Sequence, residues 1–352
     1  MSALAMATII PLFIPHEGCP HACSYCNQLH TRPLDRPGQT HYTRLTPQEI
    51  HLHIETWLAC LRPQRKKLVQ VAFYGGSFTA LPQKRQVELL TAVQPYLKAG
   101  LVHGIRLSTR PDYIEQDQLH LLRQHGVRLI ELGVQSCDDS VLARARRGHS
   151  HADSLRASAC IRASGLQLGW QLMVGMPGES FAGIRRMTAA CIREQPNCIR
   201  IYPLVVLRGS ALEKEWRGGG FQPLSLSKAV LFTAYMKKRF DAHGLAVIRM
   251  GLQPSLELEQ NILAGPYHPA FGEQVAARLM LKKTRKLLSR HRGPEPCILR
   301  IAPGDMSIFT GIRRANLKRL EALGLRSRFI LRTDASLPRQ SLQVQVLSSH
   351  TT

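Results

Sequence analysis

Three cysteines near the start of the chain have the residue type and spacing to hold a metal centre. Cys19, Cys23 and Cys26 follow an apolar run, and Gly18 and Pro20 favour a bend in the backbone around them. Soft thiolates favour zinc or an iron–sulfur cluster. Because an iron–sulfur cube usually takes four cysteines, three thiolates would leave one iron open to another ligand. An open metal position is typical of a catalytic centre.

Two other interpretations of this triple are open on the residues alone. A zinc knuckle would form if His16, His21 or His30 supplied a fourth ligand, or the cysteines are reduced and hold nothing. The other six cysteines have no regular spacing, which is typical of reduced thiols in a cytosol. They are Cys60, Cys137, Cys160, Cys191, Cys198 and Cys297.

The elements that must position these residues alternate regularly between strand and helix. Apolar runs predict six strands, each followed by at least one segment of helical periodicity. One of these helices is expected to begin at the capping box of Thr46 and Glu49, and two others to span residues 82–97 and 181–194. Alternating units of this kind imply an α/β fold with a parallel sheet, whose ligands bind at the carboxyl ends of the strands. A full eight-stranded barrel is the alternative, with residues 245–250 as a seventh strand. The six predicted strands are residues 9–15, 68–74, 105–109, 128–134, 168–174 and 199–207.

Polar and glycine residues end these predicted strands. Gly75 and Gly76 would let the backbone approach a ligand closely, although paired glycines after a strand are also a common tight turn. Ser108 ends the third strand just before Arg110 and Asp112. Capping of a helix by Asp112 and a surface position for Arg110 explain that segment about as well as ligand contact does.

The composition predicts a folded protein with a polyanionic partner. The chain has 352 residues, of which 44% are hydrophobic, and 47 Lys and Arg against 24 Asp and Glu give a net charge of +23. Nucleic acid is the obvious partner for this charge, unless the excess is spread over a solvated surface. No run of about 18 apolar residues occurs, so we expect no membrane span, and the irregularly spaced cysteines favour a cytoplasmic location.

We expect two parts in the chain, with residues 1–253 forming the core and residues 254–352 a basic C-terminal extension. The extension contains a predicted basic helix at 273–292, followed by a small α/β tail with a second basic helix at 313–323. The first helix is the candidate nucleic-acid contact, with the two basic helices flanking the mouth of the barrel. Its candidate contact residues are Lys282, Lys283, Arg285 and Lys286.

The cysteine stretch, with the aromatic Tyr25 before its third cysteine, resembles the signature of the radical S-adenosylmethionine (SAM) superfamily. The resemblance implies a (βα)6 partial TIM-type barrel, which agrees with the count of six units. It also implies that Cys19, Cys23 and Cys26 hold a [4Fe-4S] cluster, and that SAM is bound and cleaved reductively to start radical chemistry. Such chemistry needs a low-potential electron donor such as flavodoxin or ferredoxin.

The resemblance also suggests which residues contact SAM. In the superfamily a glycine block receives the SAM amino group, usually with an acid in the place that Ser77 occupies here, so a role for an acid is not carried over. In oxygen-independent coproporphyrinogen oxidases a strand-end Gln and an Arg twelve residues later hold SAM, and Gln135 and Arg147 match both. For Arg147 alone, a solvated helix end is the alternative. The predicted SAM contacts are Tyr25, Gly75, Gly76, Ser77, Ser108, Gln135 and Arg147.

Over residues 9–325 the chain looks most like the radical SAM half of the elongator catalytic subunit and its shorter bacterial relatives. Residues 108–112, 131–136, 200–203 and 248–253 carry this resemblance. That family acts on a wobble uridine in tRNA and adds an acetyltransferase domain, which this sequence does not show, so use of acetyl-CoA is not carried over. The predicted function is a radical SAM enzyme acting on a tRNA base. The alternatives are a radical SAM enzyme for a tetrapyrrole or other small metabolite, and a non-enzymatic, metal-stabilised RNA-binding protein.

Overall fold

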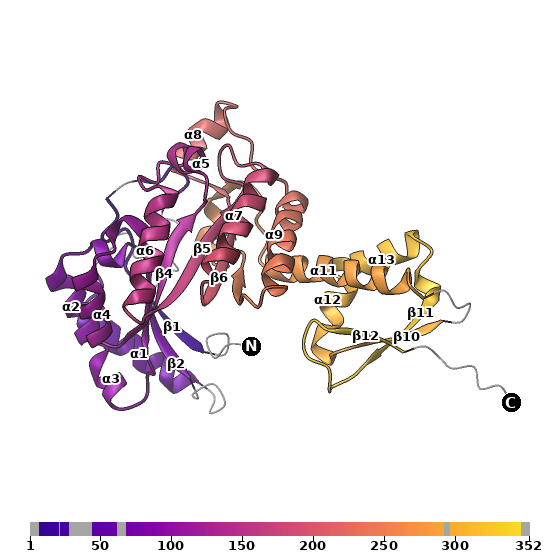
Figure 1. Cartoon of the computed structure of the whole chain (residues 1–352), viewed down its shortest axis with the longest axis horizontal. Coiled ribbons are helices and arrows are strands. Elements are labelled where there is room, and N and C mark those ends of the chain that lie inside the picture. The colour runs from indigo at the N-terminus through magenta and orange to yellow at the C-terminus, as the bar shows by residue number, and fades with distance from the viewer. Residues whose placement is uncertain (1–6, 21, 28–43, 62–67, 292–295, 346–352) are drawn as a thin grey trace.

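The computed structural model describes residues 7–20, 22–27, 44–61, 68–291 and 296–345, and its largest element is a parallel sheet of seven strands (Figure 1). The sheet has the order β1-β2-β3-β4-β5-β6-β8, and every neighbouring pair is parallel. Its strands are β1 (Thr8–Phe13), β2 (Val69–Tyr74), β3 (Ile105–Thr109), β4 (Val127–Gln135), β5 (Gln167–Val174), β6 (Cys198–Pro203) and β8 (Val247–Met250).

The sheet is curled but open, because β1 pairs only with β2 and β8 pairs only with β6 among the described strands. The expectation of a partial barrel is therefore confirmed. The strand expected only in the eight-stranded alternative is present as β8, but it forms an open edge and does not close a barrel. No helix in the described part of the chain is long and apolar enough to cross a membrane.

Helices cover one face of this sheet, and a predicted cap begins the first of them. Thr46 Oγ1 accepts a hydrogen bond from the Glu49 amide at 3.2 Å, and the Thr46 amide donates to Glu49 Oε2 at 2.8 Å. The helices are α1 (Pro47–Cys60), α2 (Gln83–Thr91), α3 (Gln94–Lys98), α4 (Gln116–Gln124), α6 (His151–Ala163), α7 (Phe181–Glu194) and α9 (Leu226–Asp241). The short α5 (Asp139–Arg144) instead packs in a separate cluster through Val141.

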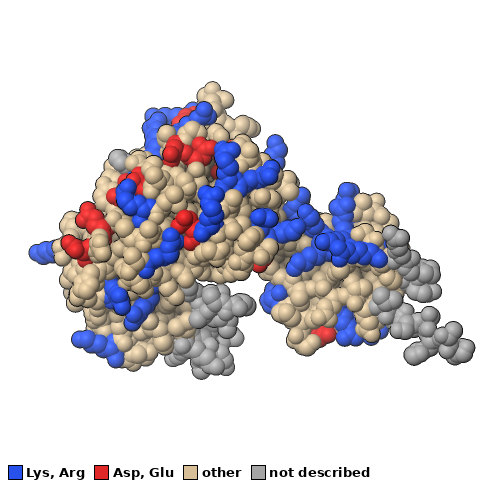
Figure 2. Space-filling view, in the orientation of Figure 1, with Lys and Arg blue, Asp and Glu red and all other residues tan. Residues whose placement is uncertain are grey.

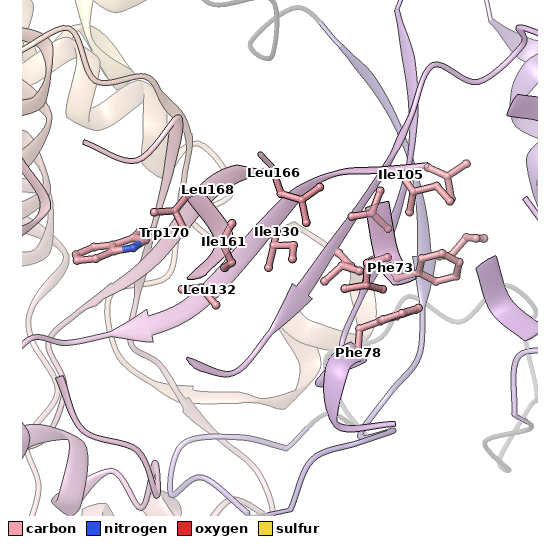
Figure 3. Close-up of a cluster of buried hydrophobic side chains, with 14 of the residues drawn as sticks. Phe73, Phe78, Ile105, Ile130, Leu132, Ile161, Leu166, Leu168 and Trp170 are labelled. Carbon is pink, nitrogen blue, oxygen red and sulfur yellow. The ribbon is translucent and has the colours of Figure 1, made fainter. Parts of the chain in front are cut away.

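The main hydrophobic core lies between the sheet and these helices. Figure 3 shows side chains from neighbouring strands, such as Phe73, Ile105 and Leu132, gathered in one buried cluster with Trp170. The indole Nε1 of Trp170 donates to Ser158 Oγ at 3.0 Å, so the largest core side chain also has its polar atom satisfied. Because successive strand residues face opposite sides, the residues between these apolar positions face the inside of the curl.

Two predicted elements are each divided in the structure, and proline accounts for both divisions. The helix expected at 82–97 forms α2 and α3, because Pro95 has no amide for a continuous helix and instead lies in the first turn of α3. The strand expected at 199–207 forms β6, which ends at Pro203, and the short β7 (Val206–Leu207). β7 pairs antiparallel with β9 (Ile262–Ala264).

A small α/β unit follows, connected by the long helix α11 (Phe271–Leu288). Its sheet has the order β11-β10-β12, with β10 (Cys297–Ile301), β11 (Phe329–Thr333) and β12 (Leu342–Gln345). Helices α12 (Met306–Thr310) and α13 (Ala315–Ala322) pack with α11 around a second core. Phe271 and Val275 of α11 pack against α9, whereas Met280 and Leu288 belong to the second core. The division at residue 253 stays a prediction.

Candidate functional site

The cysteine loop follows β1, so it lies at the carboxyl end of the sheet. It packs directly against the glycine block after β2, because the Ser77 amide donates to the Glu17 carbonyl at 2.9 Å. A Cβ added to Gly18, whose φ is +74°, would lie only 2.2 Å from the Ser77 carbonyl oxygen. Further along, the Ser24 amide donates to the Ala145 carbonyl at 3.0 Å, which fixes the loop to the end of α5.

The three cysteines are free thiols held in this loop. Cys23 is buried, while Cys19 and Cys26 are half-buried. Among the described residues, no three His, Cys, Asp or Glu side chains gather closely enough to hold one metal ion. Each cysteine of an iron–sulfur cube ligates a different iron, so ligands of a cluster need not meet at one point. His21 and His30 of the zinc alternative lie outside the described residues.

Arg147 and Gln135 lie close to each other, and Arg147 contacts the cysteine loop. The Arg147 guanidinium donates from Nη1 to Cys23 Sγ and to Tyr25 Oη, both at 3.2 Å, and from Nη2 to the Gly133 carbonyl at 2.8 Å. A Cβ on Gly133 would lie 2.9 Å from Gln135 Nε2 and 3.2 Å from Arg147 Nη2. Glycine at this position therefore lets the two side chains approach each other.

Two buried polar atoms of this pair have no hydrogen-bond partner in the described part of the chain. They are Gln135 Oε1, an acceptor, and Arg147 Nε, a donor. Buried polar atoms are normally satisfied, so an unpaired acceptor and an unpaired donor on two neighbouring side chains indicate a ligand that carries both kinds of group. The amino and carboxylate groups of SAM fit that requirement. Arg147 is 7% exposed, which excludes the solvated helix end.

Local backbone structure holds Gln135 in place. Its φ is +63°, in the left-handed region, and the Ser136 amide donates to the Val134 carbonyl at 2.8 Å across this turn. The buried His149 lies near the same carbonyl, with Nε2 at 3.4 Å. Burial, assisted by Arg147, lowers the pKa of His149 to about 4, so this imidazole is neutral at pH 7 and adds no charge beside Arg147.

The glycine block after β2 is shaped by its contact with the cysteine loop. Gly75 has a φ of +89°, and a Cβ on Gly76 would lie 2.4 Å from the Glu17 carbonyl oxygen, so neither glycine can be replaced without strain. Ser77 is fully buried. Its Oγ lies 3.1 Å from Thr109 Oγ1 and accepts from the Arg110 amide at 3.3 Å. The Ser77 hydroxyl is therefore engaged within the fold, and only the backbone of this block is presented to a ligand.

Arg110 is buried, contrary to the surface position considered from the sequence. It is 5% exposed, and its Nη2 lies 2.7 Å from Asp112 Oδ2 and also donates to the Arg147 carbonyl. Asp112 therefore pairs with Arg110 and does not cap a helix with its side chain. Through its contact with the Arg147 carbonyl, Arg110 fixes the backbone of Arg147.

The inside of the curled sheet holds a buried ionic network that we did not predict. Glu131 on β4, 1% exposed, has Oε2 2.6 Å from Arg200 Nε and Oε1 3.3 Å from Arg106 Nη1. Tyr74 Oη donates to Glu131 Oε1 at 3.0 Å. Burial alone would raise the pKa of Glu131, but Arg200 and Arg106 outweigh burial and lower it. The sequence signal that could have predicted this network is the presence of polar residues at every second position of the strands.

Ser108 belongs to this network and not to the pair around Gly133. Its Oγ accepts a hydrogen bond from Gln171 Nε2 at 2.8 Å, and the same nitrogen donates to Glu131 Oε2 at 3.1 Å. Of the predicted SAM contacts, Tyr25, Gln135 and Arg147 come together beside the cysteine loop. Gly75 and Gly76 border the loop, and Ser108 lies deeper inside the sheet.

The four predicted nucleic-acid contacts lie on the C-terminal half of α11, beyond α9 (Figure 1). All four are exposed, although Lys283 Nζ donates to the Gln340 carbonyl at 2.8 Å and so also contacts the small sheet's loop. Arg313, Arg314, Lys318 and Arg319 are exposed near α13. α11 begins beside the end of β8 and extends away from the sheet into the small unit (Figure 1), so its basic C-terminal half does not flank the barrel mouth as expected.

Comparison with known proteins identifies the family. Residues 13–190 match the family model of the radical SAM superfamily, and residues 196–281 match the radical SAM C-terminal domain. The chain belongs to the radical SAM superfamily. Its cofactors are a [4Fe-4S] cluster and SAM, and it is a radical SAM enzyme. This membership excludes two of the alternatives considered from the sequence, the zinc knuckle and the non-enzymatic RNA-binding protein.

Two curated relatives and one solved structure illustrate what the chain is similar to. It is 33% identical to a tRNA uridine(34) acetyltransferase of Methanocaldococcus infernus over 134 residues, which are 37% of this chain and 25% of that protein. It is 30% identical to Protein YhcC of Escherichia coli over 167 residues, which are 46% of this chain and 54% of YhcC. The chain thus spans about a quarter and about half of these relatives.

The solved structure is the archaeal Methanocaldococcus infernus Elp3. It has a TM-score of 0.59 and 21% sequence identity, and covers 79% of this chain and 63% of that chain. At this identity the likeness shows a shared fold. The chain therefore shares the fold of this Elp3, and part of its sequence is similar to that of the tRNA uridine(34) acetyltransferase.

Replacing Arg147 by Ala is expected to weaken SAM binding about tenfold to a hundredfold, because a charge-assisted contact is worth about 1.5–3 kcal/mol. Calorimetry on the anaerobically reconstituted protein measures this affinity. Arg144→Ala, which changes an exposed arginine at the end of α5, is the matched control. Iron content is determined in the same samples, since Arg147 also contacts Cys23. An unchanged SAM affinity would leave Arg147 with a structural role only.

Proposed function

We propose that this radical SAM enzyme modifies a base in tRNA. The observation that carries the proposal is the charge of the small C-terminal unit. Its described residues from 271 onward include fifteen Lys and Arg but only four Asp and Glu. Figure 2 shows these basic side chains running along α11 and the neighbouring α13 on one face. Such a concentration of positive charge on exposed helices favours contact with nucleic-acid phosphates.

Names of relatives support tRNA over other nucleic acids. The acetyltransferase relative is named for uridine 34 of tRNA, and it aligns with part of this chain. Phosphate contacts position a nucleic acid while base contacts specify it, so the basic helices would orient the tRNA and leave recognition of the base to the sheet interior. α11 is suited to this because its first turn packs beside the end of β8, where a Cβ on Gly251 would lie 2.9 Å from Phe271 Cβ.

Within the site we assign roles to this chain's own residues. Cys19, Cys23 and Cys26 would hold the cluster, and Arg147 and Gln135 would bind the amino-acid part of SAM. When bound, the cluster and SAM supply a radical that begins the reaction on the substrate. The protein binds and orients both molecules and excludes water. A low-potential donor such as flavodoxin or ferredoxin remains the predicted electron source.

The tRNA proposal is tested by reversing three charges on one face of α11. We expect Lys282→Glu, Arg285→Glu and Lys286→Glu together to flatten the dependence of log Kd on log salt by about two to three units. Each phosphate contact releases counterions on binding, so the loss of a contact lowers the number that is released. Lys283 is left unchanged because it contacts Gln340. Filter binding or fluorescence anisotropy with tRNA over a range of salt concentrations measures the slope.

The matched control reverses three exposed lysines on the larger unit, Lys84, Lys98 and Lys228. This variant has the same net charge as the α11 variant, so a general effect of charge would change both slopes equally. Equal slopes, or weak tRNA binding that does not respond to salt, would contradict the proposal. SAM cleavage should persist in both variants, because neither set of residues lies at the cysteine loop.

A further inference from the structure

The open edge of the sheet contains a β-bulge that turns a second arginine inward. In the pairing of β6 with β8, Ile199 lies opposite Val247, but Arg200 lies opposite Arg249, so the register shifts by one residue between them. Without the shift, Arg249 would lie on the same face as Val247, which packs on the helix-side core. Bulges next to active sites commonly redirect a side chain in this way. Arg249 therefore joins Arg200 inside the curl.

Positive charge exceeds negative charge inside the sheet. The described interior residues include three guanidiniums, from Arg106, Arg200 and Arg249, but Glu131 is the only carboxylate among them. Glu131 is shared between Arg106 and Arg200, so it compensates one of the three charges. An uncompensated charge is costly away from bulk water, and a bound anion would offset that cost.

Arg249 is the one of these three arginines whose terminal nitrogens are not paired within the described residues. Its Nε donates to the Gly251 carbonyl at 3.1 Å, and its two terminal nitrogens have no hydrogen bond or ion pair within the described residues. The residue is half-buried, so a ligand can still reach it. Tyr202 lies two residues beyond Arg200 on β6, so its side chain is on the same face of the sheet as Arg200. Burial lowers the pKa of Arg249, and the positive charge of Arg200 lowers it further. A bound anion would stabilise the charged guanidinium against both effects.

We propose that the terminal nitrogens of Arg249, with Tyr202 on the same face of the neighbouring strand β6, bind an oxyanion of the molecule that reacts inside the sheet. A phosphate or carboxylate matches the planar fork of a guanidinium. This site extends the proposed function, because it lies deeper in the sheet than the SAM pair and is separate from the basic helices. The oxyanion belongs either to a nucleotide of the tRNA or to a free anionic second substrate.

Inorganic phosphate is the probe for this site. Phosphate is titrated into the anaerobically reconstituted full chain at low salt and followed by 31P NMR. Arg249→Gln should bind phosphate at least about tenfold more weakly than the wild type. Arg239→Gln, which removes one exposed charge from α9, should bind it like the wild type. Tyr202→Phe should weaken binding by a smaller factor, and it serves as the second variant if Arg249→Gln does not fold.

Equal phosphate affinity in Arg249→Gln and Arg239→Gln would overturn the proposal. So would a loss of phosphate binding in the α11 charge variant, because the ion would then belong to the basic helix. Displacement of phosphate by saturating tRNA would assign the oxyanion to a nucleotide, and simultaneous binding would assign it to a separate substrate. If tRNA does not bind at all while Arg249 still binds phosphate, the tRNA proposal fails and this site stands.

Discussion

Cys23→Ala is expected to abolish cluster assembly and SAM cleavage together. The cysteine motif offers three thiolates, so loss of one leaves too few protein ligands to retain the cube. Cys23 is the buried member of the triple, and its sulfur lies 3.2 Å from Arg147 Nη1. Iron and sulfide analysis and the visible absorption of anaerobically reconstituted protein measure the loss, and Cys19→Ala and Cys26→Ala should behave alike.

Three other cysteines provide controls for this result. Cys60 is exposed at the end of α1, Cys160 lies on α6, and Cys191 is buried in α7. Each lies on a helix outside the cysteine loop, so its replacement by Ala should leave the iron content at the wild-type value. Cluster assembly at normal stoichiometry in Cys23→Ala would show that the ligands have been assigned wrongly.

Glu131→Gln is expected to cost about 3–5 kcal/mol of the free energy of unfolding, because it leaves Arg106 and Arg200 without their carboxylate in a buried site. Arg106 is 1% exposed, so water cannot replace the lost charge. The amide keeps the shape of the side chain, which separates loss of charge from loss of packing. Urea denaturation of the wild type and the variant at neutral pH measures the difference.

A surface pair supplies the comparison for Glu131. Glu194→Gln breaks an ion pair with Arg162, in which both side chains are partly exposed and 2.7 Å apart, and should cost no more than about 1 kcal/mol. The lowered pKa of Glu131 also sets a sign: its stabilising contribution is present above the ordinary glutamate pKa and is lost as the pH falls through the lowered value. Equal losses in the two variants would mean that the interior network adds no stability.

The order of the elements followed from the sequence alone. Apolar periodicity, the cap at Thr46 and the change in pattern after α9 are local features, and local backbone preferences act over a few residues. The strand β3 and the helix α7 have the bounds that we expected. The same locality explains why Cys19, Cys23 and Cys26 could be recognised, since all three lie in one short loop.

Tertiary structure alone decided how residues distant in sequence meet. Arg147 reaches Cys23 across 124 residues and Arg200 reaches Glu131 across 69, and each contact depends on the packing of loops and strands that no local pattern encodes. Gly133 admits the pair of Gln135 and Arg147 only because the left-handed turn at Gln135 directs its side chain back. The Ser77 hydroxyl likewise meets Thr109 from the next strand, 32 residues later in the sequence.

Arg249 illustrates the physical reason most clearly. The sequence placed a basic residue on the last strand, but strand residues alternate between two faces, and a shift of one residue exchanges those faces. The bulge opposite Arg200 made that exchange and turned Arg249 inward. The sequence determines that an arginine lies on this strand. The pairing of the strands depends on the whole sheet, so only the tertiary structure determines that this arginine faces the inside.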